Sequence, residues 1–211
     1  MCNSKIQVEL LLAMLLLSGC AIYTPPVQMP TYYYLNSAKE LSLVGRVAII
    51  ELNNNSNYPQ IAADMTGSLF QAMQKKQLFG ISIVRQTDPD WRGLQLEAGA
   101  TYTTEQLSAI RKTLKCDAVL LGDITGYQPF PHMTIGLRLK LIDLRDGQLI
   151  WAMEQVWDST DKTTEYRIKR YYESQLQAGL PGLQRQLMEV SPMEFMKFVA
   201  SEAAETLPAK K

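Results

Sequence analysis

The apolar and polar positions from residue 45 onward alternate between the two periodicities of regular secondary structure. Short apolar runs rich in β-branched residues, typical of buried strands, cover residues 46–52, 81–84 and 118–124. Between these runs, apolar residues recur at helical spacing in 61–73 and again in 107–114. The order strand, helix, strand, helix, strand predicts parallel strands that are joined by helical crossovers.

Local signals predict where these elements begin and end. The Asn-rich residues 53–57 favour a turn after the first strand. Pro59 suits the first turn of the following helix, and Gly80 is expected to end that helix. Thr103 and Gln106 have the spacing of a capping box, so we expect the second helix to begin there.

After residue 131 the apolar period changes to two. Residues 134–141 alternate between polar or small side chains and branched apolar ones, which predicts a strand with one solvated face. Asp146 and Gly147 predict a tight hairpin turn, and residues 148–157 then form the returning strand.

Two helices are expected after this hairpin. The first covers residues 164–177, and its mixed basic and aromatic run 167–172 predicts a solvated face with buried tyrosines. The second starts at Ser191, with Pro192 in the first helical position and Glu194 in the third. Together the patterns predict a single α/β domain of three-layer type, with a mixed sheet in the order βαβαβββ followed by C-terminal helices.

The N-terminal segment has the pattern of a secretion signal. Residues 10–17 form an apolar run that is too short for a membrane-spanning helix, which needs ~20 apolar residues. Leu17, Ser18, Gly19 and Cys20 resemble the bacterial lipobox, in which the signal is cut before the Cys and the thiol carries a diacylglyceryl group. We therefore predict a signal peptide over 1–19 and lipidation of Cys20, the alternatives being an ordinary cleaved signal or an anchor.

Composition narrows the functional classes. The 211 residues include 21 basic and 21 acidic side chains and one His, so neither a general attraction to nucleic acid nor a zinc site is predicted. Cleavage before Cys20 discards Cys2 and lipidation uses Cys20, which leaves Cys116 unpaired. An intrachain disulfide is therefore excluded, and Cys116 is expected to be a small buried hydrophobic residue.

Residues 20–40 are predicted to form a tether between the lipid and a domain at 41–211. Pro25, Pro26 and Pro30 remove backbone donors and favour extended conformations. The three tyrosines at 32–34 have two interpretations: a strand or arm that packs on the domain, or an aromatic patch for a partner.

Catalytic motifs are missing from the sequence. No Gly-rich phosphate loop follows the first strand, and no G-x-S-x-G elbow occurs. His132, the only His, lies between prolines and strand residues without a supporting motif. Glu51 and Asp123 lie late in two strands that we expect to be parallel. We interpret their carboxylates as solvated charges, and the alternative is that they form a catalytic pair. We predict no catalytic residue, metal ligand or cofactor.

Four features of the sequence belong together: the lipobox, the Pro-rich tether, residues 46–50 with the following 54–56, and residues 116–124. Together they resemble the curli-secretion lipoprotein superfamily, which includes the curli export channel and lipoproteins that activate penicillin-binding proteins. The similarity covers 45–158 and implies a periplasmic α/β domain that acts through protein contacts, without catalytic residues. Ala21 after the lipidated Cys is similar to the sorting pattern of outer-membrane lipoproteins, which implies an outer-membrane anchor.

One departure from this superfamily concerns the pore. A membrane β-strand needs ~9–11 residues, and the segment between the strands that end and begin near Thr125 and Met133 holds only residues 126–132. We therefore expect a member that does not form a pore.

The predicted function is a non-enzymatic envelope lipoprotein that binds or helps assemble another envelope protein. Two alternatives stay open: a small-ligand-binding or hydrolytic domain with its site around residues 53–57, and a homo-oligomeric ring without a membrane pore. The aromatic residues proposed for partner contact are Tyr32, Tyr33, Tyr34, Trp91, Tyr127 and Phe130.

Overall fold

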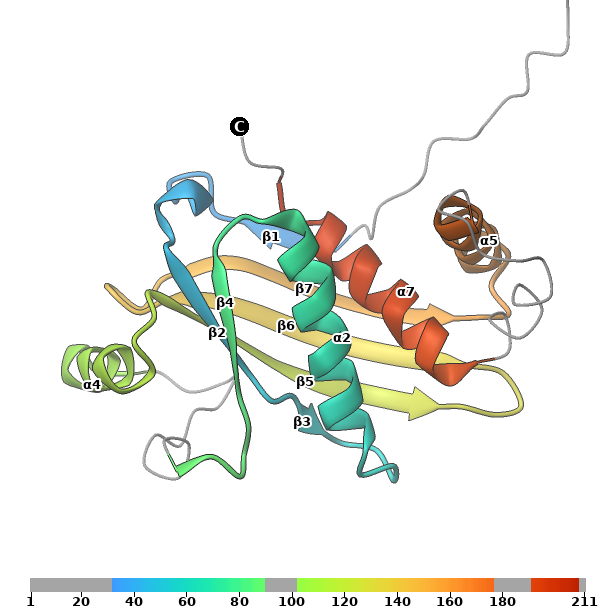
Figure 1. Cartoon of the computed structure of the whole chain (residues 1–211), viewed down its shortest axis with the longest axis horizontal. Helices are drawn as coiled ribbons and strands as arrows, with labels where there is room; N and C mark the ends of the chain where they lie inside the picture. The colour runs from blue at the N-terminus through green and yellow to red at the C-terminus, as the bar shows by residue number, and fades with distance from the viewer. Residues whose placement is uncertain (1–31, 90–101, 177–190, 209–211) are drawn as a thin grey trace, which may run out of the picture.

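The computed structural model describes residues 32–89, 102–176 and 191–208 (Figure 1). Its strands form one mixed sheet in the order β1-β7-β6-β5-β2-β4, with β3 paired to β5. The strands are β1 (Tyr33–Leu35), β2 (Arg46–Ile50), β3 (Asn53–Asn54), β4 (Gly80–Val84), β5 (Ala118–Gln128), β6 (Thr134–Asp143) and β7 (Leu149–Asp158). The predicted α/β class, with a mixed sheet and C-terminal helices, is confirmed.

The sheet combines a parallel half with an antiparallel half. β2 lies between β4 and β5 and is parallel to both, whereas β5, β6 and β7 are successive antiparallel neighbours. The apolar run of β2 is unbroken because helices cover both of its faces: Val47 and Ile49 enter one core, and Ala48 and Ile50 enter the other.

Helices form a layer on each face of the sheet. The helices are α2 (Ile61–Lys76), α4 (Thr104–Leu114), α5 (Lys162–Leu176) and α7 (Pro192–Glu205), with a short 3-10 turn, η1 (Leu41–Leu43). Figure 1 shows α2 and α7 side by side across one face, over the larger core. Leu107 and Ile110 of α4 cover the opposite face over a smaller core that contains Cys116.

The capping-box prediction is confirmed in atomic detail. The backbone N–H of Gln106 donates to Thr103 Oγ1 at 3.3 Å, and Gln106 Oε1 accepts from the Thr103 N–H at 2.8 Å. The predicted start of the last helix is also confirmed, although Ser191 makes no side-chain capping hydrogen bond. Pro192 occupies the first turn, where its fixed φ suits a helix and its missing N–H needs no partner.

Two local predictions are wrong. Asn53 and Asn54 form β3 beside β5, because their backbone continues the parallel ladder past the end of β2. Gly80 does not end α2, since that helix ends at Lys76 and Gln77 adopts the left-handed conformation with φ of 51°. Gly80 instead opens β4, where its N–H donates to the carbonyl of Gly45 at 2.9 Å.

Part of the predicted tether belongs to the sheet. β1 pairs antiparallel with β7, which confirms that the tyrosine run includes a strand on the domain. Shortly after β1, the Lys39 ammonium lies 2.9 Å from the buried Asp143 carboxylate at the end of β6. Within the three described segments, no helix has the length and apolar character needed to cross a membrane.

Candidate functional site

The aromatic residues predicted for partner contact fall into separate places. Trp91 and the lipidation residue Cys20 lie outside the residues that the structure describes. Tyr32, Tyr33 and Tyr34 lie along the outer edge of the sheet at β1, with 74%, 47% and 49% of their surface exposed. These three successive residues are all exposed, and we call them the tyrosine edge.

Among the residues that the structure describes, no strand pairs with the outer side of β1. The Tyr32 carbonyl accepts from the N–H of Glu154 at 3.3 Å, and the Asn36 N–H donates to the Ile150 carbonyl at 2.9 Å. Since peptide groups alternate direction along an antiparallel strand, those of Tyr33 and Leu35 face away from β7. The tyrosine edge therefore offers backbone hydrogen-bonding groups as well as rings.

Tyr127 and Phe130 differ in accessibility. Tyr127 is half-buried and packs edge-on against Tyr58, with ring centroids 5.2 Å apart, and burial raises its pKa. Phe130, in contrast, is 72% exposed in the loop between β5 and β6. It lines a partly apolar pocket of about 430 Å³ together with Met133 and with Ile168 of α5.

At the alternative site, the carboxyl edge of the parallel strands, several polar side chains bond to groups of the protein itself. Asn54 Oδ1 accepts from the Ser56 N–H and hydroxyl at 2.8 and 2.7 Å, and Asn54 Nδ2 donates to the Tyr58 carbonyl at 2.8 Å. Asn53 Nδ2 donates to Asp123 Oδ1 at 3.0 Å. These bonds shape the loop and engage the side chains of Asn53 and Asn54, whereas Asn55 and Asn57 are exposed.

The two carboxylates considered as a catalytic pair are bound to different partners. Asp123 is held by Asn53, whereas Glu51 Oε2 accepts from the N–H of Gln86 at 2.9 Å. His132 Nε2 lies 4.0 Å from Asp158, with 40% of its side chain exposed. Burial raises the pKa of the Cys116 thiol to about 11, so this Cys stays a neutral, buried side chain as predicted.

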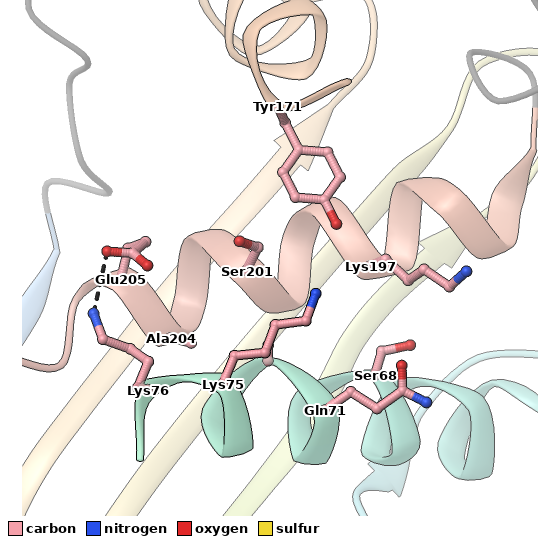
Figure 2. Close-up of a pocket in the computed structure, with 10 residues that line it drawn as sticks. Ser68, Gln71, Lys75, Lys76, Tyr171, Lys197, Ser201, Ala204 and Glu205 are labelled. Carbon is pink, nitrogen blue, oxygen red and sulfur yellow. Dashed lines mark hydrogen bonds and ion pairs between the residues drawn. The ribbon is translucent and has the colours of Figure 1, made fainter. Parts of the chain in front are cut away.

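A further pocket lies between α2 and α7, and the sequence analysis did not identify it. It has a volume of about 260 Å³, and its polar lining comes from three helices that are far apart in the sequence (Figure 2). Lys75 and Ser68 belong to α2, Lys197 and Ser201 to α7, and Tyr171 of α5 lies above them. We call it the α2–α7 pocket.

Ion pairs neutralise two of the three lysines in the α2–α7 pocket. Lys76 Nζ lies 3.1 Å from Glu205 at one end, and Lys197 Nζ lies 2.6 Å from Glu194 at the other. Lys75 is exposed and has no carboxylate within ion-pair distance among the residues that the structure describes. The described part of the pocket therefore has an excess of one positive charge.

Packing fixes the position of Tyr171 above the α2–α7 pocket. Its ring makes edge contacts with Tyr172 and with Phe198 of α7, at centroid distances of 5.5 and 5.7 Å. Burial, with a smaller contribution from Glu194, raises the pKa of the Tyr171 hydroxyl, which therefore remains a proton donor at neutral pH. Figure 2 shows this hydroxyl directed toward α7, between Ser201 and Lys197.

Arg167 is an exception to the solvated face predicted for α5, on which Lys169 and Arg170 are exposed. Its side chain is buried, and Nη1 lies 2.7 Å from Glu202 Oε2 of α7. Burial raises the pKa of the Glu202 carboxyl, although the Arg167 charge opposes this shift. Tyr172 is buried, as predicted for the tyrosines of this run.

Comparison with known proteins gives partial structural similarities. No protein-family model and no curated protein matches the sequence. The LpoB C-terminal domain from Escherichia coli is 22% identical, with a TM-score of 0.37, over 54% of this chain and 82% of that chain. Lipoprotein GNA1162 from Neisseria meningitidis is 14% identical, with a TM-score of 0.42, over 65% of this chain and 99% of that chain.

The PelC dodecamer from Paraburkholderia phytofirmans is another similar structure, 13% identical over 64% of this chain and 85% of that chain, with a TM-score of 0.43. Each similarity concerns part of the fold. The superfamily resemblance stated from the sequence remains a prediction.

Proposed function

We propose that this protein is a non-enzymatic lipoprotein of the bacterial cell envelope, and that its domain binds or helps assemble another envelope protein. Lipid on Cys20 anchors the chain to the outer membrane, and the domain faces the periplasm. The observation that carries the proposal is the tyrosine edge, where three adjacent tyrosines are exposed on the terminal strand of the sheet. No catalytic step is part of the proposal.

The tyrosine edge has the chemistry of a protein contact. Tyrosine rings supply large contact areas at a low cost in conformational entropy, and they are enriched at the centres of interfaces. A partner strand added beside β1 would also bond to the outward peptide groups of Tyr33 and Leu35. Residues 20–31 separate this edge from the proposed lipid on Cys20, so the partner would bind within the ~40 Å that such a segment can span.

Site-specific crosslinking in the native envelope tests this proposal. A photoreactive phenylalanine analogue replaces Tyr34 in the full lipidated chain, and the same analogue replaces Tyr166, an exposed tyrosine of α5, as the matched control. We expect an adduct with one other envelope protein from position 34 and none from position 166. An adduct with a second copy of this chain would support the ring alternative and overturn the proposed partner.

Side-chain substitution provides an independent measurement. Tyr32 and Tyr34 project from the same side of the strand, so Tyr32→Ser with Tyr34→Ser removes one row of rings while leaving Tyr33 and Leu35 in place. We expect recovery of the crosslinked partner by affinity purification to fall about tenfold or more. Equal recovery from this variant and from Tyr166→Ser would contradict a contact at the tyrosine edge.

A further inference from the structure

We propose that the α2–α7 pocket binds the anionic oxygens of a phosphate ester. Lys75 supplies the charge, and the hydroxyls of Tyr171 and Ser201 supply hydrogen-bond donors. This inference does not depend on the tyrosine edge, which lies on β1 at the outer edge of the sheet and supplies no residue of the pocket. The two proposals can therefore fail separately.

Charge is the first argument for an anion. Two of the pocket lysines already have carboxylate partners, at the two ends of the pocket, while Lys75 has none in the described part of the chain. In Figure 2 the Lys75 side chain extends from α2 toward α7, and Lys75 is an exposed residue. A bound anion would balance the local charge, and the paired Lys76 and Lys197 would add to the attraction.

Convergence of donors from separate helices is the second argument. Lys75 comes from α2, Ser201 from α7 and Tyr171 from α5, and all three line the same space. Donors that approach from different directions suit a tetrahedral oxyanion, which presents oxygens on several sides. The aromatic contacts of Tyr171 with Tyr172 and Phe198 hold its hydroxyl in place before a ligand arrives.

The polar residues that line the α2–α7 pocket recur at helical spacing, so each helix presents them on one side and its apolar residues on another. On α2, Ser68, Gln71 and Lys75 follow one another at intervals of three and four residues, and on α7 Lys197 and Ser201 are four residues apart. The facing residues Ala72 and Ala204 are small, so they leave space between the helices. The polar rows therefore form the walls of the pocket, whereas the apolar residues below them stay in the core.

Pocket size limits the ligand to a small group. The volume of about 260 Å³ is below the ~300–1,000 Å³ of pockets that enclose drug-sized ligands. A phosphate carrying a substituent the size of glycerol is therefore a better match than an extended polymer. Such a group occurs both in free phosphate esters and in phospholipid headgroups, and the binding chemistry is shared.

Phosphorus NMR of the full lipidated chain in a nonionic detergent tests the inference. The probes are glycerol 3-phosphate, a monoester, and dihexanoylphosphatidylglycerol, a soluble diester lipid; glycerol, observed by proton NMR, is the uncharged control. We expect concentration-dependent broadening of at least one phosphorus signal, weakened by added NaCl. Binding of the monoester alone assigns the pocket to free phosphate esters, and binding of the diester alone assigns it to lipid headgroups.

Variants locate the binding and define its failure. We expect Lys75→Gln to weaken binding about tenfold and Lys75→Arg to retain most of it, since a charge-assisted hydrogen bond is lost only in the first. Lys112→Gln, at an exposed lysine of α4, is the matched control and should bind as the unmodified chain does. Binding that is absent for both phosphates, or unchanged in Lys75→Gln with a native thermal transition, overturns the inference.

Discussion

Asp143 shows how a single buried charge is stabilised in this protein. Its side chain is fully buried, yet it accepts hydrogen bonds from Arg145 Nη2 at 2.8 Å and from Lys39 Nζ at 2.9 Å. Burial alone would raise the pKa of this carboxyl, but the hydrogen bonds from Arg145 and Lys39 outweigh that effect and lower the pKa to about 2. Asp143 therefore connects the segment after β1 to the turn between β6 and β7.

The depressed pKa predicts acid sensitivity with a defined sign. Because the folded-state pKa of Asp143 lies below its ordinary value of 3.8, its stabilisation is present above about pH 4 and is lost as the pH falls toward 2. The loss should be on the order of 2 kcal/mol. Asp143→Asn should be less stable at pH 7 and should lack this part of the acid dependence, as measured by urea unfolding at pH 7 and pH 3.

Asp146→Asn is the control for this measurement. Asp146 also pairs with Lys39, but 41% of its side chain is exposed, so its removal should change the unfolding free energy by less than about 1 kcal/mol. If Asp143→Asn retained the full acid dependence of the unmodified chain, the role assigned to Asp143 would be refuted.

Residue-scale features were the least predictable from the sequence. Neither the burial of Arg167 nor the position of Lys75 and Ser201 on one pocket follows from periodicity, because each depends on how α2, α5 and α7 pack together. Interactions between residues that are close in the sequence were easier to predict. The Thr103–Gln106 capping box was predictable because both partners lie within one helical turn.

At the scale of elements, the contact between β5 and β6 depends on the absence of a side chain at one position. A Cβ on Gly122 would lie 2.5 Å from a methyl carbon of Leu139 and 2.7 Å from the backbone oxygen of Arg138. The Leu139 side chain can turn, but the Arg138 oxygen belongs to the paired strand. A larger residue at this position must therefore displace the strand.

Gly122→Ala should consequently destabilise the protein, by about 1–3 kcal/mol in urea unfolding. Gly126→Ala, four residues later on the same strand, is the matched control, since a Cβ there meets nothing within 4 Å. We expect the control to be neutral or slightly stabilising, because alanine has fewer unfolded conformations than glycine. Similar destabilisation by both substitutions would show that the strand rejects any replacement of glycine, whatever the space.

The elements themselves were largely predictable from hydrophobic periodicity. The alternating pattern in β6 and the unbroken runs of β2 and β5 predicted both strand type and burial. The errors at Asn53 and Gly80 have one physical cause: residues that favour turns or helix ends locally were used in strands, where ladder hydrogen bonds to neighbouring chain segments decide the conformation.

At the scale of the whole molecule, the order of strands across the sheet sets a gradient of accessibility. The class of fold followed from the succession of strands and helices, but the place of β1 at the outer edge did not, because three residues carry no periodic signal. β5 is enclosed by β2 and β6, whereas β1 has a neighbour only on the β7 side within the described sheet. We therefore expect the amides of β1 to exchange through local opening of the sheet edge, and the amides of β5 to exchange only on global unfolding.

Hydrogen exchange can connect this gradient to the proposed partner contact. In the free protein, we expect the Tyr33 and Leu35 amides, which face outward, to exchange faster than the Asn36 amide, which is bonded to Ile150. Strand addition by a partner should slow Tyr33 and Leu35 selectively, whereas contact through the rings alone should leave that difference in place. The amides of α5 around Tyr166 serve as the internal control. Equal exchange rates of the Tyr33, Leu35 and Asn36 amides in the free protein would contradict the assigned register. Protection of α5 alone on partner binding would place the interface away from the tyrosine edge.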